Sequence, residues 1–382
     1  MAGTVSRTLI VTNDFPPRQG GIETFVHAMA VRFPDDEVVV HTSATPGGEA
    51  FDAGLPFPVV RDPARTLLPT GAATRRTAEL IRRHRCDSVW FGAAAPLGLM
   101  TPALRRRTDA RIFVATTHGH EVWWARTPGA RTLLRRIGDH VDTLTHLGGY
   151  TREKIAHAVG PAAAARMRRL TPGVDAAVFQ PHGDRSGTRA RYGLGERPVV
   201  LCAARLVPRK GQDTLIRALR QVHRACPDAA LLIVGSGPYE RELRALAAAE
   251  GVRDSVVFAG GHPHGAMPSF YAAADVFAMP CRTRRAGLEV EGLGIVFLEA
   301  AAAGLPVVVG ASGGAPDAVR DGETGYVVDG RDSGAVAARL LLLLENREAA
   351  REMGRKGQSW VRAEWGWDRQ YRTLAGLLGR DR

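Results

Sequence analysis

The segment LCAARLVPRKGQDTLIRAL, residues 201–219, places three cations directly after an apolar run. Arg205, Arg209 and Lys210 share one short loop, and a helix is predicted to begin near Gln212. Cations gathered at the carboxyl end of a buried strand favour the binding of an anion. Lys210 is informative because the chain has 48 arginines and only three lysines, and a lysine offers a compact charge with three donors. A solvated basic loop without a ligand is the alternative.

The segment VEGLGIVFLEAAAAGLPVVVG, residues 290–310, carries two carboxylates, Glu291 and Glu299. A helix is predicted to begin around Gly294 and Ile295, and its first amides lack partners inside the helix and are available to an anion. Glu299 lies inside this helix and Glu291 before it, so the two need not be close, and one can bind a sugar hydroxyl while the other binds a ribose. Paired carboxylates also suggest glycoside hydrolysis. That reaction on a neutral glycoside does not need the cations of the basic loop.

A third segment, TNDFPPRQGGIETF at residues 12–25, follows the first predicted strand. Pro16 and Pro17 stiffen the turn, and Gly20 and Gly21 remove side chains just before a predicted helix. Backbone amides and the helix dipole at such a start can bind an anion. The alternative is a strand-to-helix turn that needs glycine for a positive φ.

Two further segments carry weaker patterns. LLIVGSGPYE, residues 231–240, reads as strand, Gly-x-Gly and helix, but Glu240 replaces the third glycine of a dinucleotide-binding motif. TTHGHEVWW, residues 116–124, places His118 and His120 just after a strand. No third ligand is apparent, so we predict no metal site. His118 could instead donate a hydrogen bond to a substrate hydroxyl.

Short β-rich runs alternate with helical stretches, such as 212–224 and 239–250, along the whole chain, which predicts βαβ units and parallel sheets. The runs are apolar on both faces, as in sheets that helices cover on both sides. We therefore predict an α/β fold with two Rossmann-like, doubly wound domains whose strands end at a central cleft. The expected strands are 8–12, 37–42, 87–91, 111–116, 142–146, 198–203, 229–234, 255–258, 275–279, 305–309 and 325–328.

The length of 382 residues also predicts two domains. The segment 171–198 is rich in glycine, proline and charge, so we place the boundary there. The C-terminal helix carries three tryptophans, Trp360, Trp365 and Trp367, which we expect to dock it. We expect this helix to pack back on the N-terminal domain. The predicted divisions are 1–175, 176–357 and 358–382.

The formal net charge of +12 is unevenly distributed. Between Arg65 and Arg136 there are 14 arginines and only four acidic residues. Such a window indicates a phosphate-bearing partner, either nucleic acid or an anionic membrane, unless it reflects a general preference for arginine. The N-terminus carries no apolar stretch typical of a signal peptide, and the four cysteines have no metal-binding spacing. These features predict a cytoplasmic protein.

Taken together, these segments resemble the family 4 retaining glycosyltransferases of the GT-B fold, over nearly the whole chain. The shared motifs are the Gly-Gly turn, the R…RK loop, VGSGP, and the E-x7-E pattern from Glu291 to Glu299. Within the family, the amino-acid sequence of these segments is similar to that of enzymes that transfer mannose from GDP-mannose to a phosphatidylinositol monomannoside lipid. The resemblance implies that activity, with no metal or other cofactor.

The resemblance also implies roles for single residues. Arg205 and Lys210 would bind the donor diphosphate with amides near Gly294 and Ile295, while Glu299 would bind the ribose and Glu291 the transferred sugar. His118 would bind the O6 hydroxyl of that sugar. The remaining implied donor-binding residues are Gly20 and Gly21, at the diphosphate, Gly235 of VGSGP, and Gly261 in the 258–263 loop against the guanine.

The implied lipid acceptor gives the basic window a function. Residues 74–85, TRRTAELIRRHR, combine arginines with Leu80 and Ile81, so we predict peripheral binding of the N-terminal domain to the inner face of the cell membrane. Three alternatives remain open. A related enzyme could use another nucleotide sugar or acceptor. An NAD-dependent dehydrogenase shares the alternation of strands and helices, but this chain lacks the glycine motif of that class after its first strand. A nucleic-acid binder would use the arginine-rich window, but the interleaved aromatic residues expected of it are sparse, at 6% of the chain. We predict no nucleic-acid partner.

Overall fold

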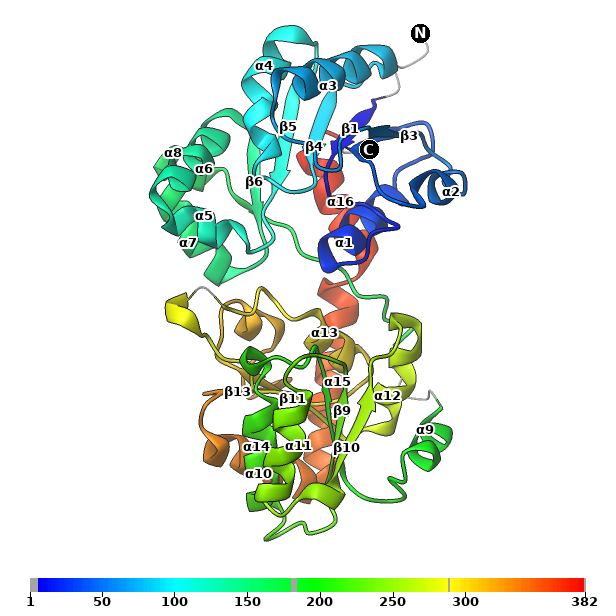
Figure 1. Cartoon of the computed structure of the whole chain (residues 1–382), viewed down its shortest axis with the longest axis vertical. Coiled ribbons are helices and arrows are strands. Elements are labelled where there is room, and N and C mark those ends of the chain that lie inside the picture. The colour runs from blue at the N-terminus through cyan, green and yellow to red at the C-terminus, as the bar shows by residue number, and fades with distance from the viewer. Residues whose placement is uncertain (1–5, 180–183, 288, 381–382) are drawn as a thin grey trace. The chain divides into compact units, whose positions relative to one another are not determined.

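The computed structural model of the chain describes residues 6–179, 184–287 and 289–380. The chain forms two compact units (Figure 1): the N-terminal unit comprises Met1–Gly173 with Trp367–Arg382, and the C-terminal unit comprises Val174–Gly366. The chain returns to the N-terminal unit at Trp367, later than the expected division between residues 357 and 358. The reason is that helix α15 (Arg347–Glu364) continues past that point without a break.

The N-terminal unit contains a seven-stranded sheet in which every pairing is parallel. Its central order 3-2-1-4-5-6 is that of a doubly wound Rossmann sheet. All five strands that we predicted for this unit are present. Two edge strands, β3 and β7, were not predicted. The strands in spatial order are β3 (Val59–Asp62), β2 (Val38–Ser43), β1 (Thr8–Val11), β4 (Ser88–Phe91), β5 (Ile112–Thr116), β6 (Thr143–His146) and β7 (Arg168–Arg169).

The C-terminal unit contains a second parallel sheet, with six strands, and all six were predicted. Its first strand, β8, lies at the centre, so the chain winds outward from it in both directions. The strands in spatial order are β10 (Val256–Gly260), β9 (Ala230–Val234), β8 (Val199–Ala203), β11 (Val276–Met279), β12 (Val307–Gly310) and β13 (Gly325–Val328).

Buried apolar side chains on both faces of the first sheet explain its position inside the N-terminal unit. Along β1, Leu9 and Val11 join one buried apolar cluster and Ile10 joins another, because successive side chains of a strand point to opposite faces. Helix α16 (Trp367–Leu377) belongs to this unit, where Leu374 packs in the same cluster as Ile10. The strand pattern therefore confirms the predicted helical cover on both faces.

Most of the described helices lie in connections between consecutive strands, as βαβ units require, and α14, α15 and α16 follow the last strand, β13. None of the described helices combines the length and apolar character that crossing a bilayer requires. The other helices of the N-terminal unit are α1 (Gly21–Ala30), α2 (Gly48–Asp52), α3 (Gly71–His84), α4 (Thr101–Arg107), α5 (Glu121–Arg126), α6 (Pro128–His140), α7 (Gly149–Val159) and α8 (Pro161–Ala165). Those of the C-terminal unit, besides α15, are α9 (Arg185–Arg191), α10 (Gln212–Val222), α11 (Glu240–Ala249), α12 (Met267–Ala273), α13 (Ile295–Ala302) and α14 (Ser333–Glu345).

The three tryptophans of the C-terminal segment divide between the units. Trp360 and Trp365 pack edge to face within the C-terminal unit, with ring centroids 5.5 Å apart. Trp367 lies in the N-terminal unit, 6.2 Å from the Phe25 ring. Trp360 and Trp365 are buried in the C-terminal unit and Trp367 packs in the N-terminal unit, so the tryptophans hold this segment in place, and only its part from Trp367 onward belongs to the N-terminal unit.

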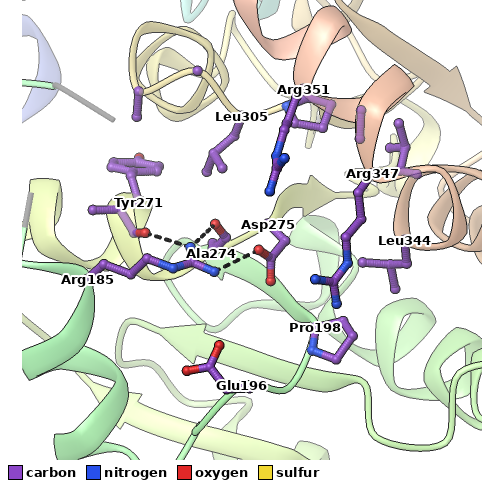
Figure 2. A pocket seen from close by; sticks show the side chains of 16 residues that line it. Arg185, Glu196, Pro198, Tyr271, Ala274, Asp275, Leu305, Leu344, Arg347 and Arg351 are labelled. Atoms are coloured by element: carbon purple, nitrogen blue, oxygen red, sulfur yellow. Dashed lines mark hydrogen bonds and ion pairs between the residues drawn. The ribbon is translucent and has the colours of Figure 1, made fainter. Parts of the chain in front are cut away.

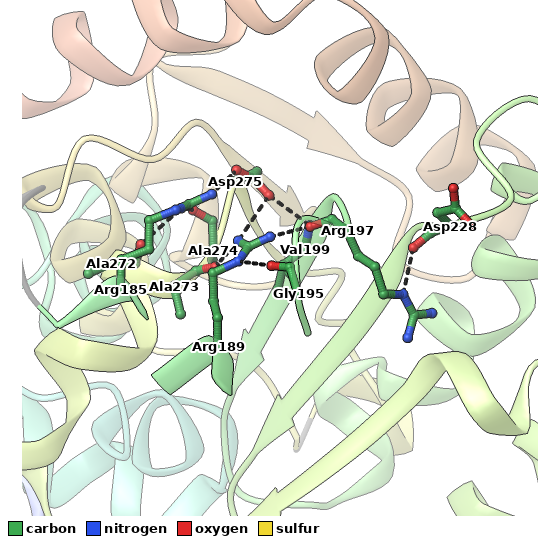
Figure 3. A network of polar contacts seen from close by, with 10 residues as sticks. All are labelled: Arg185, Arg189, Gly195, Arg197, Val199, Asp228, Ala272, Ala273, Ala274 and Asp275. Carbon is green, nitrogen blue, oxygen red and sulfur yellow. Dashed lines mark hydrogen bonds and ion pairs between the residues drawn. The ribbon is translucent and has the colours of Figure 1, made fainter. Parts of the chain in front are cut away.

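Part of the segment that we read as the boundary, 171–198, is ordered structure of the C-terminal unit. Arg189 of α9 is buried, and its guanidinium donates to the carbonyl oxygens of Gly195 at 2.8 Å and Ala273 at 2.7 Å (Figure 3). Asp275 accepts from Arg185 and from the amide of Val199 at the start of β8. These contacts fix α9 against α12 and the starts of β8 and β11.

Candidate functional site

The basic loop after β8 places its cations in different surroundings. A short 3-10 turn, Pro208–Lys210, leads from the loop into α10. The Arg205 side chain is exposed, and within the described residues its guanidinium has no hydrogen bond or ion pair. Arg209 is half-buried, and the Lys210 side chain is 12% exposed. The loop therefore presents one unpaired cation, Arg205, and two that bind a carboxylate.

That carboxylate is Glu291, which the structure brings to the basic loop. Lys210 Nζ lies 2.7 Å, and Arg209 Nη1 2.8 Å, from the same oxygen, Glu291 Oε2. The backbone of Glu291 is held by the loop after β12, where the amide of Gly314 donates to the Glu291 carbonyl at 2.8 Å. Two cations on one carboxylate leave net positive charge at the carboxyl edge of the sheet. The sequence did not predict this pairing.

The VGSGP segment supports the loop that carries Arg205. Gly235 has φ 141°, and a Cβ atom there would lie 2.0 Å from the carbonyl oxygen of Ala204. The amide of Leu206 donates to the carbonyl of Ser236 at 3.0 Å. Since the two backbones touch, only glycine fits at this position. Gly235 thus has a packing role that its motif did not reveal.

Helix α13 begins beside Glu291. Ile295 is its first residue, which confirms the predicted start, and Gly294 precedes it with φ 79°. A Cβ atom on Gly294 would lie 2.5 Å from the Phe297 ring and 3.6 Å from Glu291 Cγ. Gly294 and Ile295 are only half-buried. The first amides of the helix and the Glu291–Lys210 pair therefore lie in one region of the C-terminal unit.

Glu299 lies in the second turn of α13 and has partners of its own. The Tyr271 hydroxyl donates to Glu299 Oε2 at 2.7 Å, and His264 Nε2 lies 2.8 Å from Glu299 Oε1. Burial next to this carboxylate raises the pKa of Tyr271 well above its ordinary value. The hydrogen bond to Glu299 raises the pKa of His264. Sequence reasoning missed His264 and Tyr271, because their contacts with Glu299 join segments that are distant in the sequence and leave no local pattern.

The expected base-binding loop, 258–263, adjoins VGSGP. The amide of Gly235 donates to the carbonyl of Gly260 at 2.8 Å. A Cβ atom on Gly261 would lie 3.2 Å from Ser236 Oγ. The loops after β8, β9 and β10 therefore pack side by side at the carboxyl ends of their strands. The structure places every predicted site residue of the C-terminal unit at this edge of the second sheet.

In the N-terminal unit, the Gly-Gly turn precedes α1. Gly20 has an extended backbone with φ 171°, and Gly21 is not among the residues with positive φ. The alternative that this turn needs glycine for a positive φ is therefore wrong. A Cβ atom on Gly21 would have no other atom within 4 Å, whereas one on Gly20 would meet the carboxylate of Glu23. The space beside Gly21 is open.

His118 lies at the carboxyl end of β5, where its Nε2 is 2.6 Å from the carbonyl oxygen of Gly92. A carbonyl can only accept, so Nε2 carries the proton and Nδ1 is an acceptor. Burial lowers the pKa of His118, which keeps the ring neutral. The ring packs edge to face on Phe25 of α1, with centroids 5.2 Å apart. In this tautomer the second ring nitrogen of His118, Nδ1, can only accept a hydrogen bond.

The other polar groups near His118 are carboxylate and imidazole. Glu121 is fully buried and accepts from the His118 amide at 2.9 Å, and its second oxygen lies 3.1 Å from His120 Nε2. Among the described residues, no group of three or more histidine, cysteine, aspartate or glutamate side chains is arranged to share a metal ion.

A pocket of about 360 Å³ lies at the other edge of the second sheet (Figure 2). Pro198, Asp275 and Pro306 line it, and each stands just before a strand, at the amino ends of β8, β11 and β12. Arg347 and Arg351 of α15 also line the pocket. None of the predicted site residues contributes to it, because they follow the strands instead of preceding them.

The basic window differs from the prediction in one respect. In α3, Leu80 is 6% exposed and Ile81 is 1% exposed, so both belong to the core and are unavailable to a membrane. The helix has one buried face, and these residues lie on it because they pack against the first sheet. The large apolar side chains that are exposed in this unit lie elsewhere and include Trp123 of α5 at 51% and Leu133 of α6 at 40%.

Comparison with known proteins identifies relatives over nearly the full length. Residues 19–178 match the model of "Glycosyltransferase Family 4" and residues 184–360 match "Glycosyl transferases group 1". The chain is 50% identical over 375 residues to the GDP-mannose-dependent alpha-(1-6)-phosphatidylinositol monomannoside mannosyltransferase of Mycolicibacterium smegmatis, covering 97% of both chains. It is 45% identical, again covering 97% of both, to a Corynebacterium glutamicum enzyme whose name specifies a monoacylated acceptor.

Solved structures agree on the fold. The crystal structure of Anabaena HepE in complex with UDP superposes with a TM-score of 0.81 at 20% identity, covering 98% of this chain and 99% of that one. Sucrose-phosphate synthase from Thermosynechococcus elongatus gives a TM-score of 0.73 at 22% identity, covering 97% and 98%. The chain therefore has the GT-B fold and belongs to glycosyltransferase family 4.

Proposed function

We propose that this protein is a retaining mannosyltransferase that moves mannose from GDP-mannose to a phosphatidylinositol monomannoside lipid. The observation that carries the proposal is the group formed by Lys210, Glu291 and the start of α13, in a chain 50% identical to an enzyme named for this reaction. A diphosphate needs fixed cations and free amides, and a sugar hydroxyl needs a carboxylate. Both kinds of partner lie within this group.

The donor would occupy the carboxyl edge of the second sheet. Arg205 and Lys210 bind the diphosphate together with the amides of Gly294 and Ile295. Only one oxygen of Glu291, Oε2, holds the two cations, so Oε1 is left to accept from a hydroxyl of the transferred mannose. Glu299 binds the ribose.

The remaining donor contacts follow from the loops. The guanine lies against the 258–263 loop, which contains Gly261 and packs beside Gly235. The resemblance to family 4 also assigns Gly20 and Gly21 to the diphosphate through bare backbone, and the space beside Gly21 is open. His118 accepts from the sugar O6 hydroxyl through Nδ1, since Nε2 is bound to Gly92.

The chemistry requires that negative charge grow on the departing diphosphate as the sugar–phosphate bond breaks. Preorganised cations and amides stabilise that charge more in the transition state than in the ground state, which lowers the barrier. Retention of configuration fits a front-face substitution in which the departing phosphate takes the proton of the acceptor hydroxyl. Arg205 and Lys210 neutralise the leaving group in this scheme, so we propose that turnover needs no metal ion.

Product analysis tests the proposal directly. Incubation with GDP-mannose and a phosphatidylinositol monomannoside acceptor is expected to give the dimannosylated lipid and GDP, with equal turnover after exhaustive chelation of divalent cations. In a thermal shift assay, GDP is expected to stabilise the protein more than UDP or NADH, since a ligand that binds the folded state raises its stability. Stabilisation by UDP alone would indicate another nucleotide sugar, and stabilisation by NADH alone would contradict the proposal.

A lipid acceptor requires contact with a membrane, and we propose that α5 and α6 provide it. The two helices pack against each other and expose Trp123 and Leu133. Arg126, Arg131 and Arg136 are exposed on the same two helices. Anionic headgroups would attract these arginines by about 1 kcal/mol each, and the two apolar side chains would enter the interface. This would hold the enzyme at the inner face of the cell membrane.

Cosedimentation with vesicles containing phosphatidylinositol tests this surface. The double variant Trp123→Ser/Leu133→Ser is expected to bind about tenfold more weakly, because each half-exposed apolar side chain loses part of roughly 1.5–3 kcal/mol of burial. The matched control, Val178→Ser/Leu342→Ser, removes equally exposed side chains of the C-terminal unit and is expected to bind normally. Binding should also weaken as salt rises. Equal binding by both double variants would contradict the proposed surface.

A further inference from the structure

The Glu299 carboxylate accepts a hydrogen bond on each of its two oxygens. Tyr271 donates to Oε2 at 2.7 Å and His264 to Oε1 at 2.8 Å. A carboxylate only accepts, so the His264 Nε2 must carry a proton in this contact. Glu299 therefore enters the proposed reaction with its hydrogen-bonding capacity already used in part.

The two partners of Glu299 differ in how easily they can leave. Tyr271 is fully buried, and its ring packs on Phe179 with centroids 5.6 Å apart. The His264 side chain is 69% exposed, while the side chain of Glu299 is 4% exposed. His264 stands in a short 3-10 turn, His264–Ala266, just before α12, and only Phe179 contacts its ring edge to face among the described aromatic rings. His264 thus covers Glu299 from the solvent side and can move without disturbing the core.

We propose that His264 is a displaceable partner of Glu299, which occupies the carboxylate oxygen that the donor ribose needs and is released when the nucleotide binds. The inference rests on the proposed function, in which Glu299 binds the ribose. Two neighbouring ribose hydroxyls are two donors, and a carboxylate receives them best with both oxygens accessible. Tyr271 keeps Oε2 oriented from inside the fold, and His264 competes for Oε1. His264 is therefore a positioning residue that sets the affinity for the donor.

Charge makes this competition depend on pH. The hydrogen bond with Glu299 raises the pKa of His264, so the fraction of the ring that is imidazolium at near-neutral pH is larger than for a free histidine. The imidazolium binds the carboxylate more strongly than the neutral ring does. The other titratable groups packed around the pair are Tyr271 on α12 and, behind it, Cys202 on β8. Burial raises the pKa of both, that of Cys202 to about 12, so neither changes charge in this range. Displacing His264 is easier above its pKa than below it.

Calorimetric titration of the full-length protein with GDP between pH 5.5 and pH 8 tests the inference. GDP affinity of the wild type is expected to fall below the pKa of His264 by up to about tenfold per pH unit, the limit for one linked proton. His264→Gln keeps a neutral donor and is expected to lose this dependence, and His264→Ala is expected to bind GDP more tightly than the wild type throughout. The terminal phosphate of GDP also titrates near pH 6, but equally for all variants, so it cancels in their ratio.

Proton release on GDP binding is a second measurement, and it would not depend on His264 if this histidine were only structural. Near the pKa of His264, titrations in buffers of different ionisation enthalpy are expected to show proton release on GDP binding to the wild type, and less release for His264→Gln. Weaker binding by His264→Ala, or parallel pH profiles for wild type and His264→Gln, would overturn the inference.

A third variant separates this inference from the proposed function. Glu299→Gln is expected to weaken GDP binding at every pH if Glu299 binds the ribose. Unchanged affinity of Glu299→Gln, or no binding of GDP to the wild type, would contradict the donor assignment itself. If Glu299→Gln weakens binding while the His264 variants behave as wild type, only the role of His264 is wrong.

Discussion

Replacement of Lys210 by alanine is expected to lower mannosyl transfer by about 10²–10³-fold, the usual cost of losing one preorganised group that stabilises charge in a transition state. The loss should appear mainly in kcat, because the ammonium acts most strongly on the charge that develops as the diphosphate leaves. The fold should survive, since Glu291 keeps Arg209 as a partner at 2.8 Å and is not left as an unpaired carboxylate. Turnover of GDP-mannose and the thermal unfolding midpoint measure the two effects.

Arg209→Ala is the matched control for that variant. Arg209 and Lys210 bind the same oxygen of Glu291 at nearly equal distances, so either substitution removes one cation from that carboxylate. If Lys210 acts on the diphosphate, its loss is far more damaging than the loss of Arg209. Equal losses in kcat would mean that Lys210 only orients Glu291, and would remove it from the proposed diphosphate site.

The fold was predictable from the sequence where strands are buried. The central strands β1, β4 and β8 are apolar on both faces, and an apolar run between helical stretches is a strong signal. The two missed strands, β3 and β7, lie at opposite edges of the first sheet. β7 consists of two exposed arginines, and β3 is only partly buried, so neither carries the apolar pattern that burial imposes.

The site was predictable only in part, because topology and side-chain pairing are separate matters. Parallel sheets bring the ends of all their strands to one edge, so Lys210 and Glu291 could be assigned to one region although they lie 81 residues apart. The ion pair between them depends on loop conformation, which has no periodicity to read. The same holds for His264, whose partner Glu299 is 35 residues away. In α3 the error was of another kind: Leu80 and Ile81 sit among arginines in sequence, but helical geometry turns them toward the sheet.

Substitution of Gly235 by alanine is expected to weaken GDP binding by at least about tenfold and to lower the unfolding midpoint, although Gly235 carries no functional group. A Cβ atom at this position would lie 2.0 Å from the Ala204 carbonyl oxygen, which is backbone and cannot rotate away. Relief requires the basic loop to move, and Arg205 moves with it. Overpacking of this kind costs about 1–3 kcal/mol, in addition to the strain of φ 141°. Calorimetry with GDP and thermal unfolding measure the result.

Gly251→Ala separates the strain from the clash. Gly251 also has positive φ, at 71°, but a Cβ atom there would meet no other atom within 4 Å. Its replacement should cost only the backbone strain, about 1–2 kcal/mol, and should leave GDP affinity unchanged. If Gly235→Ala binds GDP as well as Gly251→Ala does, the loop after β8 does not need its position against VGSGP, and Arg205 cannot be a fixed ligand of the diphosphate. If GDP affinity falls in Gly235→Ala but not in Gly251→Ala, the position of Arg205 depends on the backbone contact between Gly235 and Ala204.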